Sequence, residues 1–364
     1  MTAPVRVLCC NGGAMDFGGI TTVLMNYAAH MDRDRVAVDF LVHGGNAGER
    51  EQEAVALGAR VIHVPYRREN PIRYERAAEN ACRGYDIVHA HMDGGNAAML
   101  RLARRAGVPC RIAHSHNTAF LTTNPVKLRL LRMAADRIPV YATQLAACSD
   151  AAARFLFRTT DGVMIVKNAL ALGDWVFDAA ARERVRGTLR LDGKRVLLQA
   201  GRFDYQKNQE FSLEVLRRLA ARSDDFVLVY AGDGAAREAL ARRANAEGLA
   251  DRVRFIGFYD DMRALYSAAD CFLLPSRFEG LGIVLVEAQR TGLPCIASEA
   301  VPRETRVTDC AYLPLDPERW ADAVFALRPC ADRTVSDEPF IRAGYDIVSE
   351  ARRMQDRYTE MAKR

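Results

Sequence analysis

Two glutamates, Glu279 and Glu287, stand eight residues apart across a glycine-containing turn that opens into an apolar segment. We expect a buried strand over Cys271–Leu274 before the turn and a helix over Gly282–Arg290 after it, with Glu287 about two turns into that helix. The first N–H groups of a helix lack intrahelical partners and carry partial positive charge, so they attract anions. Carboxylates suit sugar hydroxyls, and a helix N-terminus suits a diphosphate. The segment therefore predicts a nucleotide-sugar site.

A catalytic acid–base pair is the alternative role for these two carboxylates. Retaining glycosidases hold such a pair about 5–5.5 Å apart. Eight residues of α-helix turn the chain through about 800°, which leaves two side chains about 80° apart around the helix axis. The spacing therefore does not by itself bring Glu279 and Glu287 together, and binding of a donor is the better interpretation.

Arg202 and Lys207 follow another expected strand, Arg195–Ala200, in the segment Gly-Arg-Phe-Asp-Tyr-Gln-Lys-Asn. Doubly wound sheets bind phosphates close to such strand ends. Arginine offers a planar fork of donors to a phosphate, and lysine offers a mobile point charge. We expect the two cations to hold a diphosphate, and a pair of solvated surface charges is the alternative.

Gly232 and Gly234 form a Gly-Asp-Gly turn after the expected strand Phe226–Ala231. The turn begins like a dinucleotide fingerprint, but Arg237 stands in place of the third glycine, and the next strand, Val253–Gly257, does not end in an acid for a ribose. We therefore interpret it as a close-packed turn that lines a mononucleotide site and not an NAD site.

A polar turn follows the strand Val253–Gly257. The backbone at Phe258 and Tyr259 is placed to read the flat edge of a base. Asp260 or Asp261 is expected to cap the next helix, and a plain capping turn is the alternative role for the whole segment.

In the first half of the chain, Gly18 and Gly19 belong to a glycine-rich loop between an expected strand, Val5–Cys10, and an expected helix, Gly19–Met31. Such a loop lets the backbone approach a ligand phosphate or sugar closely. The alternative is a flexible surface loop.

His114 and His116 end a further strand, and they share one face if the strand continues, because alternate residues point to opposite sides. Two such histidines could bind a metal ion, but no third ligand with metal spacing is evident, and we expect no metal site. We expect His116 to face a reacting sugar; a satisfied structural histidine is the alternative. His89 and His91 repeat the spacing one strand earlier, where we expect a structural role.

The chain has the size and composition of a soluble protein with two domains. At 364 residues it exceeds the roughly 250–300 residues that one core reaches. No run of about 18 apolar residues is present, and the N-terminus lacks a signal-peptide core. Nine scattered cysteines without a Cys-x-x-Cys pair argue against disulfides and zinc and favour the reducing cytoplasm.

Positive charge is concentrated in the first half. Residues 1–168 contain 21 Lys and Arg against 15 Asp and Glu, whereas the remainder contains 30 against 31. The excess could face an anionic acceptor or the surface of a membrane, or it could be ordinary surface arginine. We expect no nucleic-acid partner.

Short apolar strands alternate with amphipathic helices in both halves, which predicts an α/β protein with two doubly wound parallel sheets. The other expected strands are Val36–Val42, Arg60–Val64, Asp86–Ala90, Arg111–His114, Leu145–Cys148 and Pro294–Ala297. The other expected helices are Glu49–Leu57, Ile72–Arg83, Asn96–Ala106, Pro125–Ala142, Asn208–Ala221, Ala235–Glu247, Asp261–Ala268, Pro317–Leu327 and Ile347–Met361. The boundary is expected after Asn168, in an irregular stretch, and ligands should bind beside the C-terminal ends of the strands.

Taken in order, these motifs resemble those of the retaining glycosyltransferases of family 4, also called glycosyl transferases group 1, over nearly the whole chain. The segments that carry the resemblance are the early Gly-Gly loop, Tyr-Asp-Ile-Val-His at 85–89, His-Ser-His-Asn at 114–117, Gly-Arg-Phe…Gln-Lys-Asn, Gly-Asp-Gly and the Glu-x7-Glu motif. Members that act in exopolysaccharide or capsule biosynthesis look most similar, including at 301–308.

The resemblance implies the GT-B fold, with two Rossmann-like domains facing each other across a cleft. It implies an acceptor-side domain over residues 1–168 plus 345–364 and a donor-binding domain over residues 169–344. Arg202 and Lys207 would stabilise the leaving diphosphate, Glu279 would contact the donor sugar, and Glu287 would contact the ribose. His116 would face the sugar and the acceptor. The remaining donor contacts would come from Gly18, Gly19, Gly232, Gly234, Phe258, Gly280, Leu281, Gly282 and Ile283.

Two features depart from the family pattern. Thr21 stands where many relatives have glutamate, and residues 298–304 lack a common Gly-Gly, so sugar contacts there are open.

The expected reaction is retaining transfer of a sugar, a hexose, from a nucleotide-diphosphate sugar, with UDP favoured, to a hydroxyl of a glycan or lipid-linked acceptor. We expect no cofactor and no metal, and a cytoplasmic protein that could also contact the inner membrane surface. The alternatives are an epimerase or sugar phosphorylase of the same fold, a nicotinamide oxidoreductase, which the glycine pattern disfavours, and a non-catalytic nucleotide-sugar binder.

Overall fold

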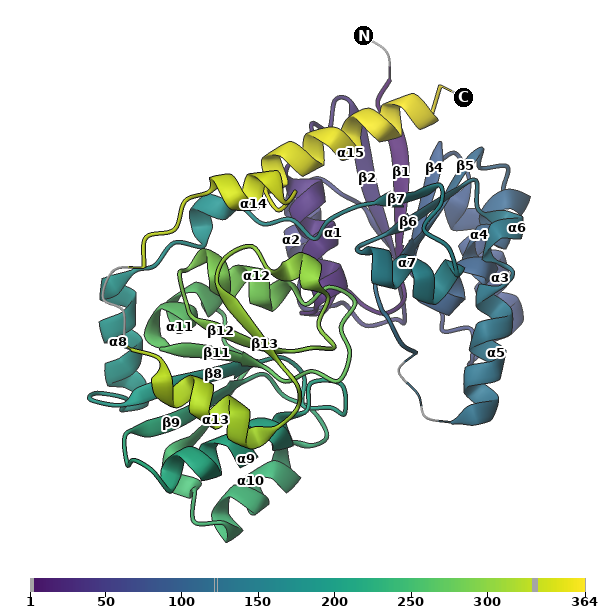
Figure 1. The fold of residues 1–364 in the computed structure, drawn as a ribbon. Helices are drawn as coiled ribbons and strands as arrows, with labels where there is room; N and C mark the ends of the chain where they lie inside the picture. Colours follow the sequence, from purple (N-terminus) through teal and green to yellow (C-terminus); the bar gives the residue numbers. More distant parts are fainter. Residues whose placement is uncertain (1–2, 121, 123, 329–332, 364) are drawn as a thin grey trace. The chain divides into compact units, whose positions relative to one another are not determined.

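The computed structural model describes residues 3–120, 122, 124–328 and 333–363 (Figure 1). The chain divides into two compact units, Met1–Ala171 with Gly344–Arg364, and Leu172–Ala343. Each unit is built on one parallel sheet with helices on its faces, which confirms the predicted α/β class with two doubly wound sheets.

The first unit contains, within the described residues, a seven-stranded parallel sheet in the order β3-β2-β1-β4-β5-β6-β7. Its strands are β1 (Val5–Asn11), β2 (Val36–His43), β3 (Val61–Val64), β4 (Ile87–His91), β5 (Cys110–Ser115), β6 (Gln144–Ala147) and β7 (Val163–Ile165). Its helices are α1 (Gly19–Ala29), α2 (Glu51–Ala56), α3 (Pro71–Cys82), α4 (Asn96–Arg105), α5 (Pro125–Ala135), α6 (Ile138–Tyr141), α7 (Asp150–Phe157) and α15 (Ile347–Met361), with a 3-10 turn at Asp93–Gly95.

The strand order of this sheet reverses between β1 and β4. Open α/β sheets bind ligands at such a switch point, outside the carboxyl ends of the strands. The loop after β1, which carries Gly18 and Gly19, and the residues at the end of β4 therefore occupy the position in the first unit that suits a ligand.

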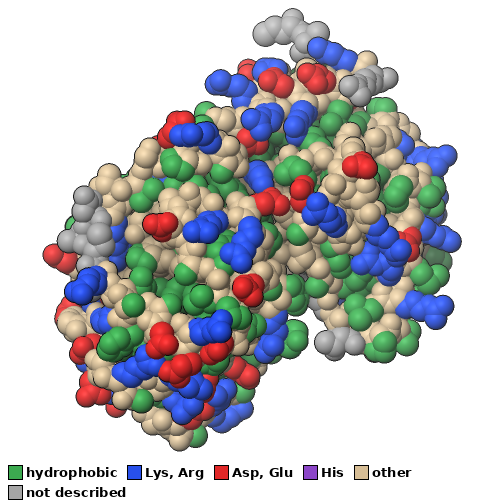
Figure 2. All heavy atoms as spheres, viewed as in Figure 1, with side chains coloured by type: hydrophobic (Ala, Val, Ile, Leu, Met, Phe, Trp, Pro, Cys, Tyr) green, Lys and Arg blue, Asp and Glu red, His purple; other side chains and the backbone are tan. Residues whose placement is uncertain are grey.

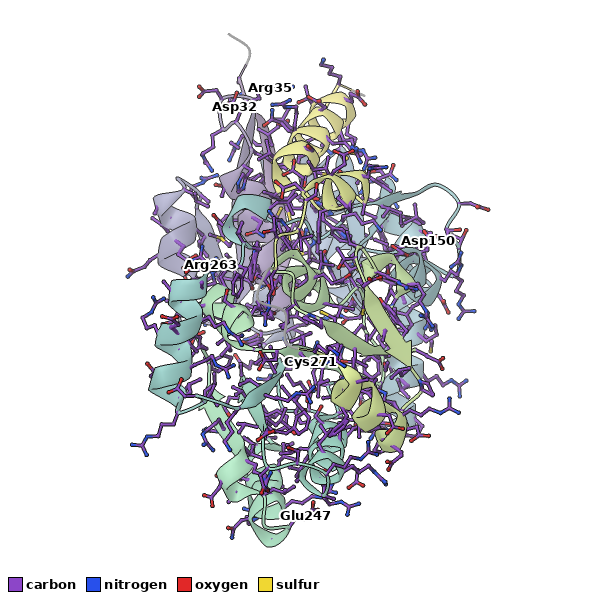
Figure 3. The ribbon with its side chains drawn as sticks, turned by 60° about the vertical axis from the view of Figure 1, so that its left-hand side comes forward. Asp32, Arg35, Asp150, Glu247, Arg263 and Cys271 are labelled. Carbon is purple, nitrogen blue, oxygen red and sulfur yellow. The ribbon has the colours of Figure 1, made fainter. Side chains whose placement is uncertain are left out.

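The last helix, α15, packs on the first unit (Figure 1). Ile347, Ala351 and Tyr358 belong to the same apolar core as side chains of β1 and α1. At the far end of β1 and β2, Asp32 and Arg35 lie beside this helix (Figure 3): the Asp32 backbone donates to Gln355, and Arg35 pairs with Asp356 at 2.9 Å. The C-terminal segment is thus an integral part of the unit that begins at the N-terminus.

The second unit contains, in the described part of the chain, a six-stranded parallel sheet in the order β10-β9-β8-β11-β12-β13. Its strands are β8 (Arg195–Ala200), β9 (Phe226–Ala231), β10 (Val253–Gly257), β11 (Cys271–Leu274), β12 (Cys295–Ser298) and β13 (Cys310–Leu313). Its helices are α8 (Ala179–Leu189), α9 (Gln209–Ala220), α10 (Arg237–Ala246), α11 (Met262–Ala268), α12 (Ile283–Arg290), α13 (Pro317–Ala326) and α14 (Glu338–Arg342), and its short 3-10 turns are Leu172–Asp174, Ala250–Arg252 and Arg303–Thr305. The order reverses between β8 and β11, which are hydrogen-bonded neighbours.

Ion pairs join the outer faces of α9 and α13 in this unit. Arg218 pairs with Glu318 at 2.5 Å, and Arg222 pairs with Glu318 and Asp322. Figure 2 shows the blue and red side chains intermixed over this region. Positive and negative side chains of the second half are thus paired locally in this region. Each pair contributes little stability because it is exposed.

Several elements differ from the sequence prediction for identifiable reasons. The single helix expected over Pro125–Ala142 is two helices, α5 and α6, because Pro139 has no N–H to continue the first one. The strands β7 and β13, at the edges of their sheets, were not predicted, nor were the helices α7, α8 and α14. Helix α8 has a weak apolar periodicity in the sequence, because only Ala181 and Val185 of its residues are buried apolar side chains.

Eight cysteines are buried and free, and Cys330 lies outside the described residues. Among the described residues, helices long and apolar enough to cross a membrane are not found.

Candidate active site

Lys207 and Glu279 form a buried ion pair at the switch point of the second sheet. The Lys207 Nζ atom lies 2.6 Å from Glu279 Oε1, and the two side chains are 16% and 6% exposed. Ser276 donates its hydroxyl to the same oxygen at 2.6 Å, and the amide of Gln206 donates to Oε2 at 3.3 Å. A carboxylate so surrounded by donors is held in one orientation.

This pair is positioned by two loops, one after β8 and one after β11, that hydrogen-bond to each other. Asn208 donates to the Pro275 carbonyl and accepts from Arg277, and the Arg277 backbone donates to the Gln206 carbonyl. Because β8 and β11 are adjacent parallel strands, their carboxyl ends open at the same edge of the sheet. Residues 72 positions apart in sequence thus meet in one site.

Arg202 behaves differently from Lys207. Its side chain is 66% exposed and lies 3.7 Å from Asp204. Both predicted cations therefore lie on the same loop and pair with a carboxylate, but the Lys207 pair is short and buried, whereas the Arg202 pair is longer and exposed.

The helix that follows the Glu279 turn begins without a capping side chain. Helix α12 begins at Ile283, with Gly282 as its N-cap residue in the left-handed region (φ 85°), and no capping side chain contacts its first turn. Gly280 and Leu281 are buried. The N–H groups of this first turn are an anion site by their direction and partial charge. Gly280, Leu281, Gly282 and Ile283 are therefore brought beside Glu279, as the sequence predicts.

Glu287 is the fifth residue of α12 and lies about one turn in, so the expectation of two turns was wrong; even a helix that begins at Gly282 places Glu287 only about 1.4 turns in. Its Oε2 atom accepts a hydrogen bond from the Tyr266 hydroxyl at 2.9 Å. Burial raises the pKa of Glu287 to about 7, opposed by the Tyr266 hydrogen bond and the charge of Lys207. Sequence reasoning did not identify Tyr266, which the fold brings from α11.

Gly232 and Gly234 allow the loop after β9 to touch the loop after β8. A Cβ atom on Gly232, at φ 124°, would lie 2.2 Å from the Gly201 carbonyl oxygen, and one on Gly234 would lie 2.6 Å from the Phe203 oxygen. The predicted close-packed turn is confirmed. Beside it, Phe258 is exposed, and Asp261 caps α11 by accepting from the Ala264 N–H, as expected of one of the two aspartates.

In the first unit, hydrogen bonds of Asn11 hold the start of the glycine-rich loop after β1. The Asn11 side chain donates to the Ala14 carbonyl and to the buried Thr21 hydroxyl, and the Asn11 carbonyl contacts His43. Gly18 is the N-cap residue of α1, which Gly19 begins, and no side chain caps it. Thr21 thus has a structural role in ordering the loop.

Four histidines gather at the ends of β4 and β5. His114 and His116 share one face, as predicted, with ring centroids 4.1 Å apart. The neighbouring strand adds His91, whose Nδ1 lies 2.8 Å from His116 Nε2, and His89, whose Nε2 lies 3.1 Å from His114 Nδ1. The statement that no third metal-type ligand accompanies His114 and His116 was therefore wrong: His91 supplies one. We call these four residues the histidine cluster.

The sequence contains a pattern from which the contact between these histidines could have been predicted. The His-x-His spacing occurs at the ends of two consecutive predicted strands, 89–91 and 114–116. Consecutive strands of a doubly wound sheet are usually neighbours, so the two pairs could be expected to meet.

Comparison with known proteins identifies the family. The glycosyl transferase 4-like domain matches residues 18–168, and glycosyl transferases group 1 matches residues 194–328. EpsF of Bacillus subtilis (strain 168), a protein named as a glycosyltransferase, is 33% identical over 359 residues, which cover 94% of this chain and 93% of EpsF. The chain belongs to the group 1 glycosyltransferases. The family membership expected from the motifs is confirmed.

Two further proteins resemble this glycosyltransferase. The UDP-Gal:alpha-D-GlcNAc-diphosphoundecaprenol alpha-1,3-galactosyltransferase of Escherichia coli is 28% identical over 225 residues, which cover 58% of this chain and 59% of that enzyme. The crystal structure of Anabaena HepE in complex with UDP-glucose matches with a TM-score of 0.74 and 18% identity, over 98% of this chain and 97% of HepE. The GT-B fold is thereby confirmed.

The buried Glu287 of this glycosyltransferase predicts a specific dependence of stability on pH. Its pKa is about 7 in the folded protein against 4.5 ordinarily, so between these values the folded state binds more protons than the unfolded state. Stability from this group is therefore present below about pH 4.5 and is lost as the pH rises to about 7, a difference of roughly 3 kcal/mol.

In urea denaturation between pH 5 and 8, we expect Glu287→Gln to gain stability relative to the wild type as the pH rises. The glutamine does not titrate, whereas the wild-type carboxyl must ionise while buried. The exposed Glu238→Gln is the matched control and should follow the wild type. A constant difference between Glu287→Gln and the wild type across this range would refute the raised pKa.

Proposed function

We propose that this glycosyltransferase moves a hexose from a UDP-sugar to a hydroxyl of a glycan or lipid-linked acceptor, with retention of the anomeric configuration. Its place would be exopolysaccharide or capsule biosynthesis. The observation that carries the donor assignment is the Lys207–Glu279 pair beside the uncapped N-terminus of α12, at the switch point of the second sheet. Positive charge for a diphosphate and a carboxylate for sugar hydroxyls stand side by side there.

Each predicted residue then has a chemical task. Lys207, Arg202 and the N–H groups at Gly282 and Ile283 neutralise the diphosphate, and Glu279 accepts from the sugar hydroxyls. Glu287, one turn further, accepts from the ribose. In this proposal the positive charge lies next to the diphosphate oxygen on which negative charge develops as the bond breaks. Electrostatic stabilisation is most effective at that position. The proposal therefore includes no metal ion in the transfer step.

In the proposed reaction, the bond between the anomeric carbon and the diphosphate oxygen breaks, and the electron pair leaves with UDP. The acceptor oxygen forms its bond on the same face, and its proton passes to the departing diphosphate. His116, which follows β5 and contacts His91 at the end of β4, is proposed to hydrogen-bond to the reacting sugar. Its pKa is lowered to about 4 by burial, so it is a neutral donor or acceptor at neutral pH.

The acceptor assignment draws on the first unit and on one relative. A surface pocket after His116 is lined by Thr118, Ala119, Phe120, Thr122, Leu128, Arg129, Arg132 and Phe155. Its two arginines suit an anionic group, and its aromatic rings suit an apolar or sugar surface. The Escherichia coli galactosyltransferase is named for a sugar-diphosphoundecaprenol acceptor. A diphosphate-linked lipid acceptor is therefore the form that we favour.

Helix α5 supports contact with a membrane surface. Val126, Leu130 and Met133 are exposed on it, with Lys127 and Arg129 between them. Exposed apolar side chains interleaved with cations bind anionic lipid surfaces. We expect the protein to sediment with anionic vesicles and not with neutral ones, and a Val126→Ser/Leu130→Ser variant to lose most of this binding. Equal recovery with both vesicle types would contradict a peripheral cytoplasmic location at the membrane.

A thermal-shift screen against UDP, GDP, ADP and their hexose conjugates tests the donor. We expect UDP and a UDP-hexose to raise the melting temperature most, since a ligand that binds only the folded state stabilises it. If none of these nucleotides stabilises the protein, the donor assignment fails.

Product analysis separates transfer from the other reactions of this fold. With EDTA present, we expect a retained glycoside only when an acceptor is added. An altered sugar from the donor alone would show an epimerase, a sugar phosphate formed with free phosphate would show a phosphorylase, and binding without any product would show a binder. Loss of transfer with EDTA would contradict the metal-independent step.

A further inference from the structure

The histidine cluster places four imidazole rings on one face of two adjacent strands. Alternate residues of a strand face the same side, and the pairing of Ala90 with Ala113 sets His91 beside His114. The ring centroids of neighbouring members lie 4.1 to 5.1 Å apart. The exposed fractions of the side chains are 2% for His89, 4% for His91, 1% for His114 and 8% for His116.

All four rings are neutral at physiological pH. Burial lowers the pKa of His89, His91 and His114 well below 6.5, reinforced by the neighbouring imidazoles, and burial lowers that of His116 to about 4. A neutral imidazole carries one N–H and one lone pair.

The hydrogen bonds leave two of these nitrogens without a partner. His91 Nε2 and His114 Nε2 are buried and make no hydrogen bond among the described residues. The other nitrogen of each ring is engaged, His91 Nδ1 with His116 and His114 Nδ1 with His89. Buried polar atoms normally find partners, so two such atoms in one cluster require an explanation.

The protons can be assigned along this network. Because a buried N–H without an acceptor is rarer than an unpaired acceptor, His91 Nε2 and His114 Nε2 are assigned as lone pairs. His114 Nδ1–H then donates to His89 Nε2, and His89 Nδ1–H donates to the Tyr358 hydroxyl at 2.7 Å. Tyr358 in turn shares a hydrogen bond with Cys9. Each contact thus has one proton, and two lone pairs remain.

We propose that the histidine cluster is a binding site for a divalent d-block ion such as Zn²⁺, with His91, His114 and His116 as its ligands. One nitrogen from each of the three lies within 4.8 Å of the others. Zn–N bonds of about 2.0–2.1 Å place ligand nitrogens about 3.4 Å apart, so the three rings must move closer together to bind an ion. His116 must also give up the hydrogen bond between its Nε2 and His91 Nδ1, because that contact engages the lone pair that His116 would offer to the metal. Imidazole nitrogens suit Zn²⁺, Cu²⁺, Ni²⁺ and Co²⁺, and not Mg²⁺ or Ca²⁺.

The outer contacts of this site are those that metal sites use. A ligating histidine normally donates its second N–H to a neighbouring acceptor, which fixes the ring. For His114 that acceptor is His89, which Tyr358 on α15 holds in turn. His116 is the most exposed of the three and stands at the end of β5, so an ion would enter on its side.

The site stands independently of the proposed function, but one consequence rests on it. If His116 contacts the reacting sugar, an ion bound to His116 withdraws it from the substrate. Zn²⁺ is then expected to inhibit transfer, in keeping with a transfer step that uses no metal.

Co²⁺ titration of the metal-free protein, with any polyhistidine tag removed, tests the site. We expect one equivalent of Co²⁺ to give the intense visible bands of a tetrahedral ion, and Zn²⁺ to displace it. His114→Gln and His91→Gln should each weaken binding by at least about 100-fold, more than the loss of an outer contact. His63→Gln, which lies outside the cluster and pairs with Glu51, is the matched control and should bind like the wild type.

Other outcomes would overturn the proposal. Equilibrium dialysis of the wild type that finds no bound Zn²⁺ refutes it without any variant. Strong near-ultraviolet thiolate bands would place the ion at Cys9, His89 and His91, the other group of ligand-type side chains that the structure brings together. Since His114→Gln could fail to fold, circular dichroism accompanies each titration, and the more exposed His116→Gln serves as the second ligand variant.

Discussion

Replacing Lys207 with alanine is expected to lower kcat by about 10²- to 10³-fold, the range seen when one preorganised donor to a developing negative charge is removed. Lys207 is the cation that the structure fixes beside Glu279, at 2.6 Å. Steady-state transfer from a UDP-hexose measures the effect. Lys194→Ala, which removes a half-buried lysine of the same unit that donates to the Asp224 carbonyl, is the control and should transfer at the wild-type rate.

A second variant separates catalysis from folding in this experiment. Lys207→Ala leaves the Glu279 carboxylate buried without its cation, which costs about 3–5 kcal/mol when a buried pair is broken. Lys207→Ala/Glu279→Gln removes that unpaired charge and should regain much of the stability. It should not regain transfer, because the diphosphate still lacks Lys207. Transfer that returns together with stability, or that never falls in Lys207→Ala, would contradict the role of Lys207.

Gly232→Ala is expected to destabilise the second unit by at least about 3 kcal/mol, from overpacking and from the left-handed backbone together. The new Cβ would lie 2.2 Å from the Gly201 carbonyl oxygen, and backbone cannot move aside as a flexible side chain can. Since this contact joins the loops after β8 and β9, UDP binding should weaken as well. Urea denaturation and a UDP titration measure the two effects.

Gly248→Ala is the matched control for this substitution. Gly248 has φ 69°, but a Cβ there meets no atom within 4 Å, so only the backbone strain of about 1 kcal/mol remains. A larger loss in Gly232→Ala than in Gly248→Ala reports the close approach of the two loops together with the added strain of φ 124° over φ 69°. Equal losses would show that backbone conformation alone accounts for the glycine at position 232.

Much of the arrangement of the proposed donor site could be predicted from the sequence because its parts are local. Glu279, the glycine turn and the start of α12 lie within five consecutive positions, and the backbone N–H groups of a helix start need no distant partner to be recognised. The same holds for Gly232 and Gly234, whose turn was interpreted correctly as close-packed. The length of helix before Glu287 was overestimated, because the five residue steps from Gly282 to Glu287 span only about 1.4 turns.

Contacts between distant segments could not be predicted in the same way. Lys207 and Glu279 are 72 residues apart, and they meet because the order of the sheet makes β8 and β11 neighbours. Tyr266 reaches Glu287 from another helix. From the sequence, His89 and His91 of β4 were each expected to have a structural role. In the fold, β5 lies beside β4, so these two histidines contact His114 and His116, and Tyr358 of the C-terminal helix hydrogen-bonds to His89.

The sequence by itself determined the α/β class, the family and the residue types that could hold a nucleotide sugar. Hydrophobic periodicity, turn residues and strand-end motifs are written locally along the chain, and they suffice for this. Only the tertiary structure decided which of those residues touch. The ion pair of Lys207 with Glu279, the raised pKa of Glu287 and the histidine cluster all depend on strand order and burial, because desolvation and side-chain contacts exist only when distant segments pack together.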